Sequence, residues 1–295
     1  MTKACVMWLA VLIAGIGNAM AETLVERGSY LVNTIMACGN CHTPKDASGQ
    51  PMSGKELSGG GLTFNTPGFT ATASNITPDR ETGIGAWSDA DIRRALTEGI
   101  RPGHVALGGV PLAPPMPSVF YKALTTRDLD AVVAYLRAVP PIRNMVPAPV
   151  YKMPVKYVPY PGAEQPYSED ALKDPVKRGA YLVTAGHCMI CHTPFVNGVP
   201  DYKGAFGKGG RAFGPPGDIG FPNTWDGSVS RNITAHEKSG LGSWSDIEIK
   251  RAITRGISRD GRVLKPPMAF GWYAHLDDAD LDAIVAWLRT LPPLE

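Results

Sequence analysis

The pentapeptide Cys38-Gly-Asn-Cys41-His42 recurs in the second half of the chain as Cys188-Met-Ile-Cys191-His192. Two thiols three positions apart on a helical turn point the same way, so each can bond one vinyl group of a single porphyrin. The histidine that follows then lies under the iron as an axial ligand. A Cys-x-x-Cys-His run is the attachment signal of c-type haem. The sequence therefore predicts two covalently bound haem c groups, one at each copy.

Two other uses of paired cysteines have to be weighed against haem. A thioredoxin-like dithiol needs no histidine after its second cysteine and is expected in a βαβ setting, which the sequence does not show. A zinc site would need the two distant copies to bring four thiolates together. The recurrence of the whole pentapeptide within a longer repeat favours haem over both alternatives.

Length and composition indicate an ordinary globular protein of about two domains. The chain has 295 residues, 44% hydrophobic and 19% charged, and a formal net charge of +2. This balance favours neither nucleic acid nor an anionic membrane surface as a partner. Residues 1–21 read as a secretory signal peptide, with Lys3 before an apolar run and Ala19-Met-Ala21 as the cleavage site. An uncleaved anchor is the alternative, but no later segment is apolar for about 20 residues.

An internal repeat extends well beyond the cysteines. Asn75-Ile-Thr77 and Gly83 to Gly99 return as Asn232-Ile-Thr234 and Gly240 to Gly256, with Trp87-Ser-Asp89 matched by Trp244-Ser-Asp246. Ser88 with Asp91, and Ser245 with Glu248, have the spacing of capping boxes and predict the start of a helix. Gly99 and Gly256 suit the left-handed position that ends one.

A second repeated feature is a methionine after two prolines. Pro114-Pro-Met116 matches Pro266-Pro-Met268. Paired prolines hold an extended backbone, which can carry a thioether to the open face of the iron. A methionine is more often core filler, but His/Met ligation is usual in cytochromes c. The repeat therefore favours Met116 and Met268 as axial ligands, opposite His42 and His192.

Other parts of the repeat leave two readings open. The glycine- and proline-rich loops at about 45–73 and 195–230 can wrap a porphyrin edge, or they can be solvated surface excursions. Trp87 and Trp244 can donate an indole N–H to a haem propionate, or they can be buried side chains that hold the loop.

The chain divides into four segments. The signal peptide (1–21) is followed by a first module (22–141), a proline-rich connector (142–173) and a second module (174–295). Each module closes with an amphipathic helix, Leu124 to Pro141 and Leu276 to Pro293, for which Thr125 and Asp277 are the candidate N-caps. The prolines of the connector indicate a semi-rigid spacer.

Several of these repeated residues resemble those of a known protein family. Asn75-Ile-Thr-Pro78, Gly83-Ile-Gly85 and Pro114-Pro-Met116 resemble a class I cytochrome c module, and most closely the modules of multihaem cytochrome subunits of bacterial alcohol, aldehyde and gluconate dehydrogenases. The resemblance covers nearly all of the chain after residue 21. It implies an all-α fold of two tandem modules, with His42 and His192 proximal and Met116 and Met268 distal. Those subunits usually have three modules and often a membrane-attaching segment, so membrane attachment and quinone reduction do not carry over.

These observations favour a periplasmic electron carrier over an enzyme. Its partners would be redox proteins, a dehydrogenase donor and a cytochrome or oxidase acceptor, with no integral membrane span but with peripheral membrane association left open. The rival is a dihaem peroxidase or a haem-based thiosulfate oxidoreductase, which needs one open iron; paired His/Met ligands argue against it. A haem sensor is less favoured, because no signalling segment accompanies the motifs.

Overall fold

A computed structural model of the chain describes residues 21–103, 109–214 and 226–295. Residues 1–20 of the expected signal peptide lie outside the described residues. The described part of the chain is mostly helical. Its helices are α1 (Leu24–Asn33), α2 (Cys38–His42), α3 (Asp89–Glu98), α4 (Ser118–Tyr121), α5 (Thr126–Ala138), the 3-10 helix η2 (Ala171–Lys173), α6 (Pro175–Ala185), α7 (Cys188–His192), α8 (Asp246–Arg255), α9 (Phe270–Tyr273) and α10 (Asp278–Leu288).

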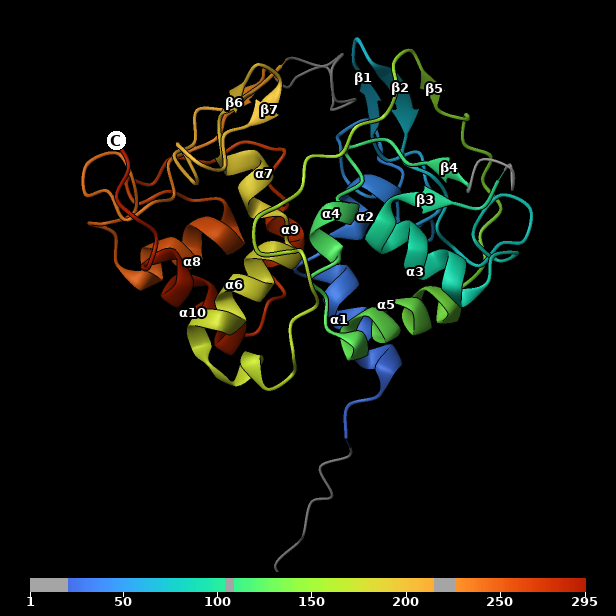
Figure 1. Cartoon of the computed structure of the whole chain (residues 1–295), viewed down its shortest axis with the longest axis horizontal. Coiled ribbons are helices and arrows are strands. Elements are labelled where there is room, and N and C mark those ends of the chain that lie inside the picture. The colour runs from blue at the N-terminus through green and yellow to red at the C-terminus, as the bar shows by residue number, and fades with distance from the viewer. Residues whose placement is uncertain (1–20, 104–108, 215–225) are drawn as a thin grey trace, which may run out of the picture.

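The helices occur in the same order in residues 22–141 (the first half) and residues 174–295 (the second half). Helices α1 to α5 of the first half correspond to α6 to α10 of the second. In Figure 1 the two halves lie side by side, and α4 and α9 lie at the boundary between them. The short helices α4 and α9 follow directly after the Pro-Pro-Met runs and were not expected from the sequence.

Each half is built around one close helix crossing. Helix α1 packs on α5 through Gly28, and α6 packs on α10 through Gly179. A Cβ atom at Gly28 would lie 2.0 Å from the carbonyl oxygen of Ala131, and one at Gly179 would lie 1.9 Å from that of Ala283. Only glycine lets the backbones approach this closely. The helices then bury their apolar faces, including Leu31 and Leu182.

The helix ends follow from local sequence. Ser88 and Asp91, and Ser245 and Glu248, form both hydrogen bonds of a capping box, as expected. Gly99 and Gly256 end these helices with φ of 70° and 62°, in the left-handed region that favours glycine. The Thr125 hydroxyl caps α5 by accepting a hydrogen bond from the backbone N–H of Asp128. Asp277 occupies the N-cap position of α10, but its side chain accepts no capping hydrogen bond, so the cap expected there is absent.

Short strands accompany the helices and were not part of the all-α expectation. In the described residues they are two to four residues long, and they lie mainly in the glycine-rich loops, where extended segments cross and pair their backbones. They are β1 (Thr63–Asn65), β2 (Phe69–Thr72), β3 (Ile100–Arg101), β4 (Val110–Pro111), β5 (Val150–Tyr151), β6 (Phe195–Val196), β7 (Val199–Pro200), β8 (Ala212–Phe213) and β9 (Ser228–Val229). All pairings are antiparallel, β1–β2–β5, β3–β4, β6–β7 and β8–β9.

The proline-rich segment 142–173 packs against both halves. Strand β5 pairs with β2, and the Tyr157 hydroxyl lies 2.9 Å from the carbonyl oxygen of Gly99. Tyr160 is buried between the halves, with its ring 4.5 Å from that of Phe120 and 6.1 Å from that of Phe206. One continuous hydrophobic core therefore runs through both halves.

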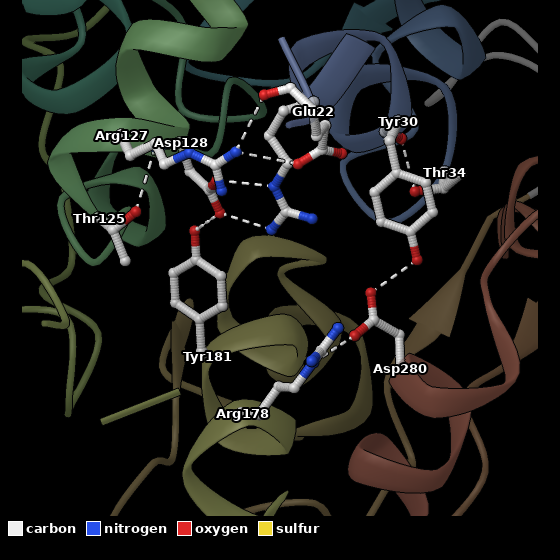
Figure 2. A network of polar contacts seen from close by, with 10 residues as sticks. Glu22, Tyr30, Thr34, Thr125, Arg127, Asp128, Arg178, Tyr181 and Asp280 are labelled. Atoms are coloured by element: carbon white, nitrogen blue, oxygen red, sulfur yellow. Dashed lines mark hydrogen bonds and ion pairs between the residues drawn. The ribbon is translucent and has the colours of Figure 1, made fainter. Parts of the chain in front are cut away.

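A reciprocal polar network also joins the halves (Figure 2). In the first half the buried carboxylate of Asp128 accepts two hydrogen bonds from Arg27, both 2.8 Å, and one of 2.5 Å from Tyr181 of the second half. In the second half the buried carboxylate of Asp280 accepts a hydrogen bond of 2.6 Å from Arg178 and one of 2.6 Å from Tyr30 of the first half. Each half thus supplies an Asp–Arg pair and receives a tyrosine from the other.

No helix within residues 21–103, 109–214 and 226–295 is long and apolar enough to cross a membrane.

Candidate haem-binding sites

Each Cys-x-x-Cys-His run forms one short helix, α2 or α7. The residue before each helix is in the left-handed region, Ala37 with φ of 47° and His187 with φ of 43°, so the chain turns sharply into it. After each helix the backbone becomes extended at Thr43 and Thr193, ahead of a proline that cannot continue the helix. The chain therefore turns away from the motif in both halves.

The two motif histidines are held by the same backbone contact. Nδ1 of His42 lies 2.7 Å from the carbonyl oxygen of Ser74, and Nδ1 of His192 lies 2.7 Å from that of Arg231. A carbonyl can only accept a hydrogen bond, so Nδ1 carries the proton and Nε2 is left as the free lone pair. Burial lowers the pKa of both imidazoles and thus favours the neutral form that binds metals. This is the arrangement expected of an axial iron ligand.

The threonine after each motif anchors the glycine-rich loop. The Thr43 hydroxyl accepts a hydrogen bond of 3.0 Å from the N–H of Leu57, and the Thr193 hydroxyl accepts one of 3.3 Å from that of Gly207. Gly59 and Gly209 donate their N–H groups to the carbonyl oxygens of His42 and His192, both at 2.7 Å. The loops are thereby tied to the helices α2 and α7.

One cavity of about 2690 Å³ is lined by every candidate site residue. The set consists of two thiols, one imidazole and one thioether from each half: Cys38, Cys41, His42, Met116, Cys188, Cys191, His192 and Met268. A typical small-molecule pocket holds roughly 300–1,000 Å³. The cavity is larger than one such pocket, and its walls are mostly apolar, as a porphyrin requires. The residues present therefore fit haem c.

The four thiols do not have the properties of a redox dithiol. They are free cysteines, and burial raises the pKa of Cys38 and of Cys188 to about 12 and that of Cys41 to about 11. A reactive dithiol needs a lowered thiol pKa. Among the described residues, no three His, Cys, Asp or Glu side chains form a metal-binding group either.

The two motifs share a wall. Cys41 and Cys191 both pack on a small apolar cluster of Leu62 and Phe213. Trp272 of the second half lies against α2, where its Nε1 would be 3.0 Å from a Cβ atom at Gly39. Phe120 of the first half lies against His187, with 6.3 Å between the ring centroids. Each motif helix is therefore covered in part by the other half.

The expected roles of the glycine-rich loops and the tryptophans remain predictions. Trp87 and Trp244 are half-buried and line the cavity, as do parts of both loops. The backbone carbonyl of Trp87 accepts a hydrogen bond of 2.5 Å from Arg137, and that of Trp244 accepts one of 2.5 Å from Arg289. These two arginines, which reach back from α5 and from the end of α10, were missed in the sequence although they stand at matching positions of the repeat.

The repeated Asn-Ile-Thr run has a structural role that spacing alone did not suggest. Asn75 Nδ2 donates to the carbonyl oxygen of Ile142 at 2.7 Å, and Asn232 Nδ2 donates to that of Leu294 at 2.6 Å. Each asparagine thus ties the loop segment beside the motif histidine to the segment that follows the closing helix.

Comparison with known proteins agrees with this geometry. A family model described as cytochrome c matches residues 176–292. This part of the chain is similar to a cytochrome c domain. Such domains bind haem c covalently, and the match contains α7 with its Cys-x-x-Cys-His run.

Several proteins with similar sequences are named as cytochromes or cytochrome subunits. The chain is 32% identical over 92% of its length to the gluconate 2-dehydrogenase cytochrome c subunit of Pantoea cypripedii, and 31% identical over 92% to the cytochrome c subunit of the quinone alcohol dehydrogenase of Gluconobacter oxydans. It spans 60% and 55% of those two proteins. It is 28% identical over 88% of its length to a diheme cytochrome c-type protein of Cereibacter sphaeroides, of which it spans 83%.

Proposed function

We propose that the protein is a periplasmic dihaem cytochrome c that relays single electrons from a dehydrogenase partner to a downstream carrier or oxidase. The observation that carries the proposal is the single cavity lined by two complete sets of two cysteines, one histidine and one methionine. A haem c group supplies reversible one-electron chemistry when bound. The chain itself supplies the side chains that would hold and orient the two haem groups.

The residues divide into two matching sets. Cys38 and Cys41 would hold the first haem, with His42 as the proximal ligand and Met116 as the distal ligand. The second set has the same order and roles: Cys188, Cys191, His192 and Met268. The Nδ1 hydrogen bonds to Ser74 and Arg231 support this assignment, because they orient the imidazoles.

Two tandem cytochrome c modules, 22–141 and 174–295, joined by the connector 142–173, account for the repeated order of helices. The connector then does more than space the modules, because Tyr160 is buried between them. A rigid arrangement of this kind keeps the two haem sites at one distance, and a relay benefits because electron transfer depends on that distance.

The proposed partner is inferred from the relatives, and the proposed location is inferred from residues 1–21. Gluconate and alcohol dehydrogenase subunits among the relatives point to a dehydrogenase as the donor. The signal-like residues 1–21 support export to the periplasm.

The first test is the intact mass of the protein isolated from the periplasm. Loss of residues 1–21 together with a gain of two haem masses is expected. A mass with one haem, or with none, contradicts the dihaem proposal.

The second test separates a relay from an enzyme. Reduced protein is mixed in a stopped-flow instrument with an oxidised small cytochrome, and separately with hydrogen peroxide or thiosulfate. Fast oxidation by the cytochrome, with modest dependence on ionic strength, is expected because the net charge is only +2. Catalytic consumption of peroxide or thiosulfate would instead indicate an open iron and a dihaem peroxidase or a thiosulfate oxidoreductase.

A further inference from the structure

An arginine beside the second motif has an unusual environment. The guanidinium carbon of Arg211 lies 4.1 Å from the ring centroid of Phe195 and 4.9 Å from that of Phe213. Its Nη1 donates a hydrogen bond of 2.6 Å to the carbonyl oxygen of Ile190, which lies between the two motif cysteines. The side chain thus holds its charge between two aromatic faces, directly against helix α7.

No carboxylate of the described residues forms an ion pair with Arg211. A guanidinium keeps its proton in proteins, so Arg211 is charged. A positive charge therefore lies in the wall of the cavity, directly beside helix α7.

The first half has no such group at the matching position. In β8 and β9 Ala212 pairs with Val229, and in β1 and β2 Thr63 pairs with Thr72. Arg211 directly precedes β8, and its carbonyl oxygen accepts a hydrogen bond from the N–H of Ser230. Leu62 directly precedes β1, and its carbonyl oxygen accepts the equivalent bond from the N–H of Ala73. Leu62 therefore stands in the first half where Arg211 stands in the second.

The first half carries a cation elsewhere. The Lys45 ammonium lies 5.5 Å from the Trp272 ring centroid and 3.4 Å from Oδ1 of Asn40, and it acts on the Cys41 thiol. It stands at the position that Phe195 occupies in the second half. Lys45 therefore serves as a natural control for the effect of one positive charge near one motif.

We propose that Arg211 raises the reduction potential of the second haem, the one at the site of Cys188, Cys191 and His192. The inference rests on the proposed dihaem function. An electron added to a haem iron lowers its positive charge by one unit. A fixed cation nearby, in surroundings of low polarity, stabilises that reduced state relative to the oxidised one.

The test compares variants that change charge and shape separately. Arg211→Gln keeps a donor for the Ile190 carbonyl but removes the charge, whereas Arg211→Lys keeps the charge. Lys45→Gln removes a charge beside the other motif. The two potentials are measured by redox titration, and the haem methyl signals in the NMR spectrum assign each potential to its haem.

Arg211→Gln should lower the reduction potential of the second haem by about 59 mV, which corresponds to a tenfold change in a one-electron equilibrium constant. The reduction potential of the first haem should change less. Arg211→Lys should retain most of the wild-type value. Lys45→Gln should lower the first potential more than the second. If Arg211→Gln does not fold with two haems, Leu62→Arg is used instead. This substitution should raise the reduction potential of the first haem.

An unchanged second potential in Arg211→Gln, with both haems and the methionine-to-iron absorption band intact, would overturn the inference. Equal shifts of both potentials in Arg211→Gln and Lys45→Gln would also overturn it, because the charge would then act globally. A wild-type protein with fewer than two haems would instead contradict the proposed function.

Discussion

The Tyr181 hydroxyl donates a hydrogen bond of 2.5 Å to Oδ2 of Asp128, and the two residues belong to different halves of the chain. Both are almost fully buried, with 1% of each exposed. Oδ1 and Oδ2 of Asp128 also accept the bidentate pair of hydrogen bonds from Arg27. The same relation holds in reverse between Tyr30 and Asp280. The halves are thus joined by two equivalent charge-assisted hydrogen bonds, related by the internal repeat.

Tyr181→Phe is expected to lower the free energy of unfolding by about 1.5–3 kcal/mol, because it removes a hydrogen bond to a buried charged group. Tyr30→Phe should have an effect of the same sign, and chemical denaturation of the haem-loaded protein measures both. Tyr151→Phe is the control, because that hydroxyl donates to the Pro111 carbonyl in an exposed setting. Equal stability of Tyr181→Phe and Tyr151→Phe would show that the connection between the halves contributes little.

Local features of this fold could be predicted from the sequence. The capping boxes at Ser88 and Ser245, and the left-handed glycines that end α3 and α8, depend on residues within one or two turns. The Cys-x-x-Cys-His runs likewise carry their own helical geometry. Such features are readable because the interacting groups are neighbours in the chain.

Contacts between distant residues could not be predicted in the same way. Tyr30 and Asp280 are 250 positions apart, and nothing in either neighbourhood indicates the pairing. Asp277 looks like an N-cap, yet its backbone N–H donates to the Tyr30 hydroxyl and its side chain does not cap the helix. The position of Arg211 between two phenylalanine rings also depends on how the second loop folds over α7. These details are set by tertiary packing, which the repeat alone does not specify.

The close helix crossings give a second prediction. Gly28→Ala and Gly179→Ala should each destabilise the protein by about 1–3 kcal/mol, because the new methyl group must displace the backbone of α5 or α10. Gly271→Ala is the matched control, since a Cβ atom there meets no atom within 4 Å. Thermal unfolding monitored by circular dichroism distinguishes the variants. A neutral effect of Gly28→Ala would mean that the two helices can separate at little cost.

The axial ligands give a third prediction. Met116→Ala or Met268→Ala should remove half of the near-infrared sulfur-to-iron band of the oxidised protein and lower one reduction potential, because a thioether ligand raises the potential of a haem. Met36→Leu is the control. Met36 also lines the cavity and is 1% exposed, and leucine has a similar volume to methionine. Loss of half of the band in Met36→Leu, or a band of full intensity in either alanine variant, would assign ligation to a different residue.

The last prediction concerns pH and His187, which lies directly before the second motif and has Ala37 as its counterpart in the first half. Burial lowers the pKa of His187 from 6.5 to about 4 in the folded protein. Between these values the unfolded chain binds a proton that the folded chain does not, so stability falls as pH drops from 6.5 toward 4. His187→Ala should therefore weaken the pH dependence of the unfolding free energy in this window. His275→Ala is the control for the loss of one histidine at an exposed position. Parallel stability profiles for the His187→Ala variant and the wild type would mean that His187 binds its proton equally well in the folded and unfolded chains.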